Sequence, residues 1–278
     1  MKLVAEIGCN HGGSVETAKE MIRSAAVFCM VDVVKFQKRN PHECLTVEEY
    51  NAPHPDESHA FGDTYGAHRE HLEFTPRQHA ELKKYANKLG VEYACSVFDV
   101  TSIKQMAKLK PAYIKIGSGH NLKWDLYDAL FKHWKGEIHV STGATKHSEI
   151  TDIVDYFRDN GREPVLYLCT SAYPAQVIDL CLNELGFLGA FGCATGFSGH
   201  HTGISPDLAA VTMGVQYVER HFTLDRASKG TDHAASLEPD GMRKLSKYIK
   251  DIKMAMRYKE PEVLMCEMGL RNKKCNIQ

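Results

Sequence analysis

The chain has 278 residues, of which 43% are hydrophobic and 25% are charged, the composition of a globular protein large enough to bury a substantial core. This composition excludes a disordered chain, a collagen and a small disulfide-stabilised protein. The 34 Lys and Arg residues nearly balance the 35 Asp and Glu residues, so the net charge of -1 gives no electrostatic reason to expect a nucleic acid as a partner.

The nine cysteines are odd in number, scattered, and never spaced as CxxC, which argues against a structural zinc site and a disulfide framework. Several lie in apolar runs, as Cys169 does, where a thiol acts as a small hydrophobic group in a reducing compartment. The apolar N-terminal stretch contains Glu6, and no run reaches the roughly 18 apolar residues of a membrane span. We therefore expect a cytoplasmic protein with no signal peptide and no membrane partner.

Short β-branched or aromatic runs recur along the chain, and each is followed by a stretch of helical periodicity. The runs predict strands near residues 3–8, 31–37, 91–97, 112–117, 137–142, 164–170, 191–197 and 215–222. The stretches predict helices over residues 15–28, 75–89, 101–109, 122–133, 148–160, 178–185, 205–213 and 239–258. Strict alternation gives parallel strands with crossover helices, and eight such units close as an α/β fold of the (β/α)8 TIM barrel type.

Two segments depart from this alternation. Residues 38–74 are rich in His, Pro, Asp and Glu without periodicity, so we expect a long inserted loop there. Residues 261–278 are too few for a further domain and are expected to form a C-terminal tail. The predicted organisation is one catalytic barrel over residues 1–260, with the insertion and the tail.

Polar side chains follow every predicted strand, at the end of the barrel where active sites lie. Lys35 and Lys115 stand inside apolar strands, where an unpaired charge is costly. Together with hydroxyl groups at neighbouring strand ends they predict a cradle for a phosphate or a carboxylate. The hydroxyl groups are those of Ser96, Ser118, Ser141, Ser171 and Ser198. The alternative is that each lysine forms a structural ion pair with Glu6 or Asp99.

His200 and His221 end the seventh and eighth strands, which are neighbours in a closed barrel. Two imidazoles with open positions suit a divalent ion such as Mn²⁺, Fe²⁺, Co²⁺ or Zn²⁺. The alternative is that each histidine only forms hydrogen bonds, and His201 is expected to point elsewhere. Asp232 follows the eighth strand on a glycine-containing loop, where it either binds a substrate hydroxyl or forms a turn.

Eight short strings of the sequence resemble motifs of the N-acetylneuraminate (sialic acid) synthase family, in the same order. The resemblance extends over residues 1 to about 260. The strings are EIGCNHGG at 6–13, VKFQ at 34–37, LEF at 72–74, KIGSG at 115–119, STG at 141–143, CTSAYP at 169–174, GFSGH at 196–200 and ERHFTLD at 219–225.

The resemblance implies a transferase that condenses phosphoenolpyruvate with N-acetylmannosamine to give N-acetylneuraminate and phosphate. It implies a divalent metal cofactor, first of all Mn²⁺, with Mg²⁺ or Co²⁺ as alternatives, and a homodimer. Carried over by position, it assigns the metal to His200 and His221, and the sugar to Glu6, Gln37, Tyr173 and Asp232. It assigns phosphoenolpyruvate to Lys35, Ser96, Lys115, Ser118, Ser141, Ser171 and Ser198.

The chain departs from the family pattern at several positions. Gly199 and His201 flank His200 where the family often has Asp and Thr, so either His200 or His201 is open as the ligand, with His200 favoured. His120 and Ser171 stand where an acid and Asn are common. Members of the family carry a C-terminal antifreeze-like domain whose arginine reaches the partner's sugar site, and this sequence stops at Gln278.

We therefore expect phosphoenolpyruvate to bind normally and the sugar weakly. We also expect the insertion to close over the barrel mouth as a substitute lid. Its polar groups include Glu43, Tyr50, Asp56, Tyr65 and Arg69.

In the implied reaction, C3 of phosphoenolpyruvate attacks the sugar aldehyde, water captures C2, and phosphate leaves by C–O cleavage. The base that activates this water is either Glu6 or a water on the metal. Related synthases are open as alternatives: one acting on a diacetamido-trideoxy hexose, giving a legionaminate or pseudaminate type of acid, or one acting on N-acetylmannosamine 6-phosphate, for which Arg39, Arg69 or Lys229 supply cations. Different classes are a metal-dependent hydrolase and a non-catalytic carbohydrate-binding or scaffold barrel.

Overall fold

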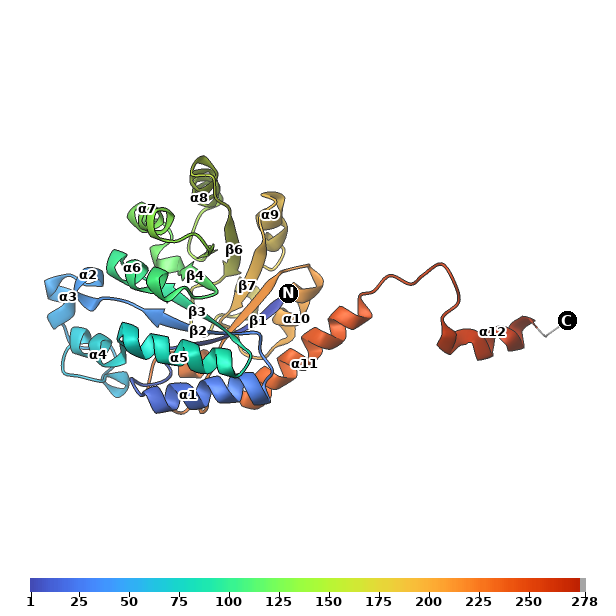
Figure 1. Cartoon of the computed structure of the whole chain (residues 1–278), viewed down its shortest axis with the longest axis horizontal. Helices are drawn as coiled ribbons and strands as arrows, with labels where there is room; N and C mark the ends of the chain where they lie inside the picture. The colour runs from blue at the N-terminus through green and yellow to red at the C-terminus, as the bar shows by residue number, and fades with distance from the viewer. Residues whose placement is uncertain (276–278) are drawn as a thin grey trace.

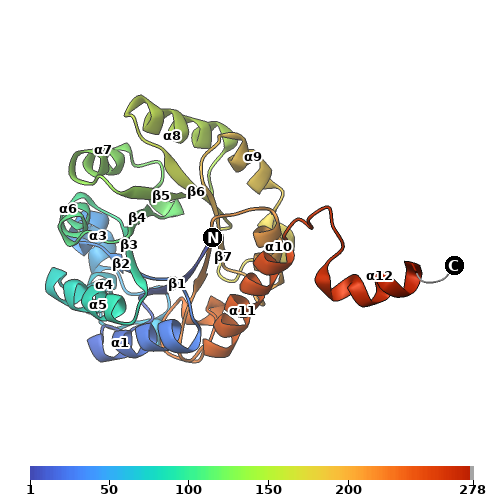
Figure 2. The same cartoon turned by 45° about the vertical axis from the view of Figure 1, so that its right-hand side comes forward.

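Eight parallel strands form a closed barrel in the computed structural model, which describes residues 1–275 (Figures 1 and 2). Each strand pairs with the next one along the chain, and β8 pairs back to β1. The strands are β1 (Lys2–Gly8), β2 (Val33–Lys38), β3 (Glu92–Val97), β4 (Tyr113–Ile116), β5 (Glu137–Ser141), β6 (Pro164–Cys169), β7 (Thr195–Gly199) and β8 (Tyr217–His221). The predicted (β/α)8 TIM barrel is confirmed.

Helices surround the barrel as an outer ring (Figure 2). They are α1 (Val15–Arg23), continued by a π-helical turn η1 (Ser24–Phe28), α5 (Pro76–Lys88), α6 (Val100–Leu109), α7 (Trp124–His133), α8 (His147–Asp159), α9 (Glu184–Ala190), α10 (Ser205–Thr212) and α11 (Pro239–Ala255). Local sequence fixes several starts: the Thr75 side chain caps α5, which has proline at its first position, and Asp99 caps α6.

The apolar core has two parts. The larger one lies between the strands and the helices, and includes Ile7, Phe36, Ile114, Leu166 and Val218. The smaller one fills the inside of the barrel with Val4, Val33, Ala94, Tyr113, Val165, Tyr167 and Tyr217. The buried His139 ring stacks on Tyr113 there, with ring centroids 3.7 Å apart. This aromatic layer closes the barrel. The polar side chains that stand two residues further along the strands, such as Lys115 after Tyr113, lie above it.

The insertion differs from the expected long loop. It contains α2 (Pro41–Cys44), α3 (Val47–Asn51), a 3₁₀ turn η2 (Glu57–His59) and α4 (Tyr65–Leu72). Thr46 and Thr64 cap α3 and α4, and the rings of His54 and His68 lie 4.4 Å apart between them. Helices of one or two turns are too short to produce a periodic apolar pattern, so periodicity does not predict them.

Residues 178–197 are also arranged differently from the prediction. The predicted helix 178–185 is a 3₁₀ turn η4 (Val177–Leu180) followed by α9, and β7 begins at Thr195 instead of residue 191. Gly192, with φ of 75°, follows the end of α9, so residues 191–192 form a turn, and residues 193–194 connect this turn to β7.

After α11 the chain continues through a 3₁₀ turn η6 (Met265–Glu267) to α12 (Met268–Cys275), which lies away from the barrel in both views (Figures 1 and 2). The last three residues of the predicted tail, 276–278, lie outside the described residues. Among residues 1–275, no helix is both long and apolar enough to cross a bilayer. All nine cysteines are free thiols.

Candidate functional site

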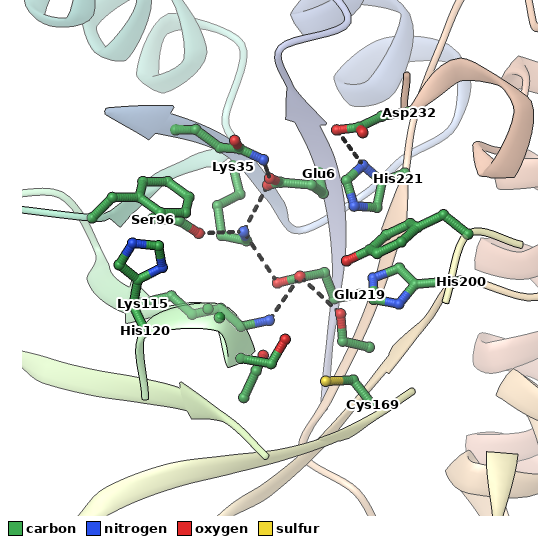
Figure 3. A pocket seen from close by; sticks show the side chains of 18 of the residues that line it. Glu6, Lys35, Ser96, Lys115, His120, Cys169, His200, Glu219, His221 and Asp232 are labelled. Carbon is green, nitrogen blue, oxygen red and sulfur yellow. Dashed lines mark hydrogen bonds and ion pairs between the residues drawn. The ribbon is translucent and has the colours of Figure 1, made fainter. Parts of the chain in front are cut away.

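A cavity of about 330 Å³ opens at the carboxyl ends of the strands (Figure 3). It is lined by nearly all of the predicted site residues, namely Glu6, Lys35, Gln37, Ser96, Lys115, Ser118, Ser141, Tyr173, Ser198, His200, His221 and Asp232. Ser171 is the exception: its side chain lies next to the cavity, with its Oγ 2.8 Å from the Oγ of Ser118.

The strand register explains why these side chains meet. Glu6 is paired with Lys35 on one side and with His221 on the other, so three neighbouring strands present these groups at one level of the barrel. Ser96 is likewise paired with Gln37 and Lys115. Because side chains alternate along a strand, the positions two residues apart on β2, β7 and β8 also face inward.

The two buried lysines are bound to carboxylates. The Nζ of Lys35 lies 2.7 Å from Glu6 Oε2, 3.6 Å from Glu219 Oε2, and donates to Ser96 Oγ at 2.7 Å. The Nζ of Lys115 donates to Glu219 Oε1 at 2.7 Å, and Ser198 Oγ donates to the same oxygen at 3.0 Å. Structural ion pairs of the lysines therefore exist, with Glu6 and Glu219 as the carboxylates.

Asp99 does not take part in these pairs. It caps α6 by accepting from Ser102 N at 2.6 Å, and it accepts from Asn40 N at 2.6 Å.

These contacts set the charges of the site. Burial alone would raise the pKa of Glu219, but Lys115 and Lys35 hold that pKa well below its usual range. Burial alone would lower the pKa of Lys35, yet Glu219 and Glu6 outweigh it and raise the pKa. For Lys115 burial prevails and lowers the pKa, although Glu219 opposes it. An additional negative charge beside Lys115 would therefore stabilise its protonated form.

His200 and His221 face the cavity from β7 and β8 with ring centroids 5.5 Å apart (Figure 3). His200 Nδ1 lies 2.8 Å from the carbonyl oxygen of Thr170, a contact that places the proton on Nδ1 and leaves Nε2 free as a ligand. Burial, with His221 nearby, lowers the pKa of His200 to about 3, so its imidazole is neutral at physiological pH. His201 points away from the cavity and is fully buried behind the barrel wall.

The histidine pair fits a divalent ion by its chemistry. The Nδ1 atom of His221 is buried without a hydrogen-bond partner, and Asp232 Oδ2 lies 3.7 Å from it. His, Cys, Asp and Glu side chains of residues 1–275 form no group of three or more arranged to hold an ion. An ion at this pair would take its other ligands from water or substrate oxygens, as ions at open catalytic sites do.

Two arginines lie at the mouth of the cavity. Arg39 contacts Gln37 Oε1, lies 3.6 Å from Glu73 Oε1, and its guanidinium lies 4.2 Å from the centre of the Phe98 ring. Arg69, from α4 of the insertion, donates from Nε to Tyr65 Oη at 3.0 Å. Lys229 does not line the cavity; its Nζ lies 5.1 Å from the centre of the Phe61 ring.

Some lining residues were absent from the predicted site. The most important is Glu219, which contacts both lysines, and the others include Phe98, His120 and Cys169. The alternation of β8 contained the sign needed to find Glu219, because it stands two residues before His221 and so faces the same side.

Comparisons with known proteins identify the family of this chain. The NeuB family profile matches residues 21–261. The chain is 33% identical to N-acetylneuraminate-9-phosphate synthase of Mus musculus, over 98% of this chain and 75% of the relative. It is also 33% identical to N,N'-diacetyllegionaminic acid synthase of Campylobacter jejuni, over 91% of this chain and 77% of the relative.

Among solved structures, N-acetylneuraminic acid (sialic acid) synthetase of Leptospira borgpetersenii superposes with a TM-score of 0.81 at 27% identity, over 99% of this chain and 91% of that one. These relatives are sugar-acid synthases. Fold, motif order and sequence identity together show that the chain belongs to the NeuB family.

Proposed function

We propose that this protein is a phosphoenolpyruvate-dependent synthase that joins phosphoenolpyruvate to N-acetylmannosamine or a close relative of it and releases phosphate. The observation that carries the proposal is the convergence of two buried lysines, several serines and two neighbouring imidazoles in one cavity. The names of the relatives support a sugar-acid product.

The lysines and serines supply an anion site. The cavity is lined by four cationic side chains, Lys35, Arg39, Arg69 and Lys115, against the three carboxylates Glu6, Glu219 and Asp232. Phosphoenolpyruvate entering it would share Lys115 with Glu219 and receive hydrogen bonds from Ser96, Ser141 and Ser198. The buried donors are already oriented by the strands, so little side-chain entropy is lost on binding.

His200 and His221 would hold the divalent cation, with Mn²⁺ first and Mg²⁺ or Co²⁺ as alternatives. When bound, such an ion supplies a Lewis acid for the aldehyde oxygen of the sugar. The direct contact between Thr170 and His200 supports this role because it orients the ring from behind.

The remaining groups serve the sugar and the water. C3 of phosphoenolpyruvate forms the new bond to the aldehyde carbon, water adds to C2, and the C–O bond to phosphate breaks. Glu6 accepts from Gln37 Nε2 at 2.9 Å and lies at the level of Lys35, a position from which its carboxylate can take a proton from that water. Tyr173 and Asp232, at the mouth, would bind sugar hydroxyls.

A second candidate acceptor is N-acetylmannosamine 6-phosphate. The observation that favours it is the pair Arg39 and Arg69 at the mouth, where the far end of a sugar would lie. Replacing Arg69 by Met should then raise the KM of the 6-phosphate roughly tenfold, as loss of a charge-assisted hydrogen bond does, and leave that of N-acetylmannosamine unchanged. Arg77→Met, at an exposed position on α5, is the matched control.

The deciding assay measures phosphate release from phosphoenolpyruvate with Mn²⁺ across N-acetylmannosamine, its 6-phosphate and diacetamido-trideoxy hexoses. Release that requires one of the sugars supports the proposal and identifies the acceptor. Release without any sugar would instead indicate a hydrolase. Sugar binding without turnover would indicate a carbohydrate-binding barrel.

The proposal includes a homodimer in the cytoplasm. The nine free thiols support a reducing compartment. Sedimentation equilibrium of the whole chain measures the mass directly, and a monomeric mass at micromolar concentration would contradict the dimer.

A further inference from the structure

Three charged or polar side chains form a buried cluster outside the cavity, behind the ends of β7 and β8. His201, Asp207 and Arg220 are 0%, 0% and 1% exposed. Arg220 Nη1 donates to Asp207 Oδ2 at 2.6 Å, and His201 Nε2 lies 3.2 Å from the same oxygen. We call these three residues the β7–β8 cluster.

Gly199 is required by this cluster. A Cβ atom at Gly199 would lie 2.7 Å from Cε1 of His201, closer than real Cβ atoms approach other groups, and 3.1 Å from Cδ of Arg220. The acid that is common in the family at this position therefore has no room here while His201 occupies the space. The carboxylate that contacts Arg220 comes from Asp207, near the start of α10.

The cluster is joined to the backbone of the segment that follows β7. Arg220 Nη2 donates to the carbonyl oxygen of His201 at 2.6 Å, and Nη1 donates to that of Gly203 at 2.7 Å. The register between β7 and β8 ends at the pair Gly199 and Arg220. Beyond that pair the β7–β8 ladder does not connect His200 to His221: His221 is paired with Glu6 of β1, and the His200 carbonyl accepts from Ala175 N at 3.0 Å. Arg220 joins these two segments directly.

Sequence neighbours carry the effect into the cavity. His201 follows His200, and Arg220 precedes His221, so these two members of the cluster face outward where their neighbours face inward. A shift of Arg220 relative to His201 would move the two imidazoles relative to each other.

Stability alone does not explain the cluster. Buried ion pairs contribute little net stability, because desolvation offsets the attraction, and their best-attested role is to fix one arrangement. Here Asp207 Oδ1, Arg220 Nε and His201 Nδ1 are each buried without a hydrogen-bond partner. Burial of these atoms costs desolvation free energy, while the contacts of Arg220 fix the segment after β7 relative to the end of β8.

We propose that His201, Asp207 and Arg220 are positioning residues that hold His200 and His221 at the separation a shared divalent cation requires; this inference rests on the metal site of the proposed function. The cluster touches neither substrate nor ion. It acts through the backbone at the ends of β7 and β8.

The test compares two affinities in each variant. Arg220→Lys keeps the positive charge and loses the fork that joins Asp207 to the two carbonyl oxygens. The Mn²⁺ dissociation constant, measured by electron paramagnetic resonance of the free ion, should rise about 10- to 100-fold, as for other residues that support metal ligands from behind. The affinity of the metal-free protein for inorganic phosphate, measured by calorimetry, should stay within about twofold. Glu219, which precedes Arg220 and contacts both lysines, is held by strand pairing with Val4 on one side and Ser198 on the other, whereas His221 is paired on the β1 side only.

His79→Ala is the matched control. His79 is also 0% exposed and its Nδ1 lies 2.5 Å from Tyr93 Oη, but it packs behind β3. It should lower the thermal unfolding temperature and leave both affinities unchanged. Should Arg220→Lys fail to fold, His201→Ala decides instead: it keeps the contact between Arg220 and Asp207 and should weaken Mn²⁺ at least about fivefold.

The two ways in which the inference can fail are distinguishable. A folded variant that binds Mn²⁺ like wild type, or that weakens Mn²⁺ and phosphate equally, would overturn the positioning role and leave the metal site standing. Wild-type protein that binds no Mn²⁺, with or without phosphoenolpyruvate, would contradict the metal site of the proposed function and the positioning role with it.

Discussion

Lys115 is the residue on which the proposed anion site depends most. It is 3% exposed, its Nζ lies 4.0 Å from the centre of the Tyr167 ring, and its carboxylate partner is Glu219. Lys115→Ala should raise the KM for phosphoenolpyruvate roughly 10- to 100-fold and reduce kcat, because a charge-assisted contact to the anion is lost. Steady-state kinetics with Lys2→Ala as control, at the opposite end of the barrel, measure this, and unchanged phosphoenolpyruvate binding would show that Lys115 is structural.

His221 provides the second prediction at this scale. His221→Ala removes one of the two imidazoles at the proposed metal site, so Mn²⁺ affinity should fall and kcat should drop at least about 100-fold. Chelation of the wild-type protein should abolish turnover and added Mn²⁺ should restore it. Full activity in the variant or in chelated protein would disprove a catalytic metal at this pair.

The amino-acid sequence was sufficient to predict most single residues of the site, but not the contacts that Glu219 makes there. Lysines within apolar strands are costly, which makes Lys35 and Lys115 conspicuous in the sequence by itself. Glu219 faces the same side of β8 as His221, but its position alone does not reveal which cations it contacts. Only closure of the barrel brings Lys35 and Lys115 to Glu219 and turns Arg220 toward Asp207.

Among the elements, the insertion is the one that shapes the mouth of the cavity. Its α4 supplies Arg69, its His59 Nδ1 accepts from Gly230 N at 3.1 Å, and its Phe61 stacks on His71 with ring centroids 4.9 Å apart. It therefore bridges to the loop after β8 that carries Asp232.

Deleting residues 53–63 tests this role. The deletion removes the contacts of His59 and Phe61 with residues 229–230 while keeping Arg69, so the sugar KM should rise roughly tenfold with the phosphoenolpyruvate KM nearly unchanged. Calorimetric titration of intact and deleted protein with each substrate measures the difference. Tight sugar binding that survives the deletion would show that this part of the insertion does not hold the sugar.

The prediction of elements succeeded where a periodic apolar pattern was long. It failed where short helices and turns set the bounds of the elements. The helices α5, α8 and α11 each have at least 13 residues and agree with the predicted ranges within three residues at both ends. The short helices of the insertion depend on single caps such as Thr46 and on ring stacking between residues distant in sequence. The start of β7 depends on the turn at Gly192. This turn lies within the mostly apolar run 191–197, so the run by itself predicts a strand that begins too early.

The architecture of the whole molecule followed from alternation alone, because eight strand and helix units in series have few ways to pack other than a closed parallel barrel. The pairing of β8 with β1 brings together residues from opposite ends of the domain. A local sequence pattern does not predict which of their side chains are in contact inside the barrel.

Buried histidines make the stability of the whole molecule depend on pH. Burial lowers the pKa of His11 to about 3, that of His79 to about 3 and that of His139 to about 4, against about 6.5 in an unfolded chain. The unfolded state therefore takes up protons first as pH falls, so the stabilising contribution is complete above about pH 6.5 and is lost toward pH 3 to 4. Each histidine should add a slope of up to about 1.4 kcal/mol per pH unit.

Urea unfolding at several values between pH 7.5 and 4.5 measures this slope in the free energy of unfolding. His79→Phe, which keeps a ring and removes the titrating group, should give a shallower slope than wild type. Equal slopes in the two proteins would show that His79 does not contribute.

The tyrosine layer inside the barrel also leads to an expected order of steps in the proposed reaction. Tyr113, Tyr167 and Tyr217 close the space beneath Lys115, while Tyr173, 53% exposed, lies at the mouth. In the proposed reaction phosphoenolpyruvate would therefore bind beside Lys115 before the sugar settles above it, and phosphate would leave after the sugar acid. Phosphate should then inhibit competitively against phosphoenolpyruvate but not against the sugar, and a large excess of sugar, by entering first, should slow turnover.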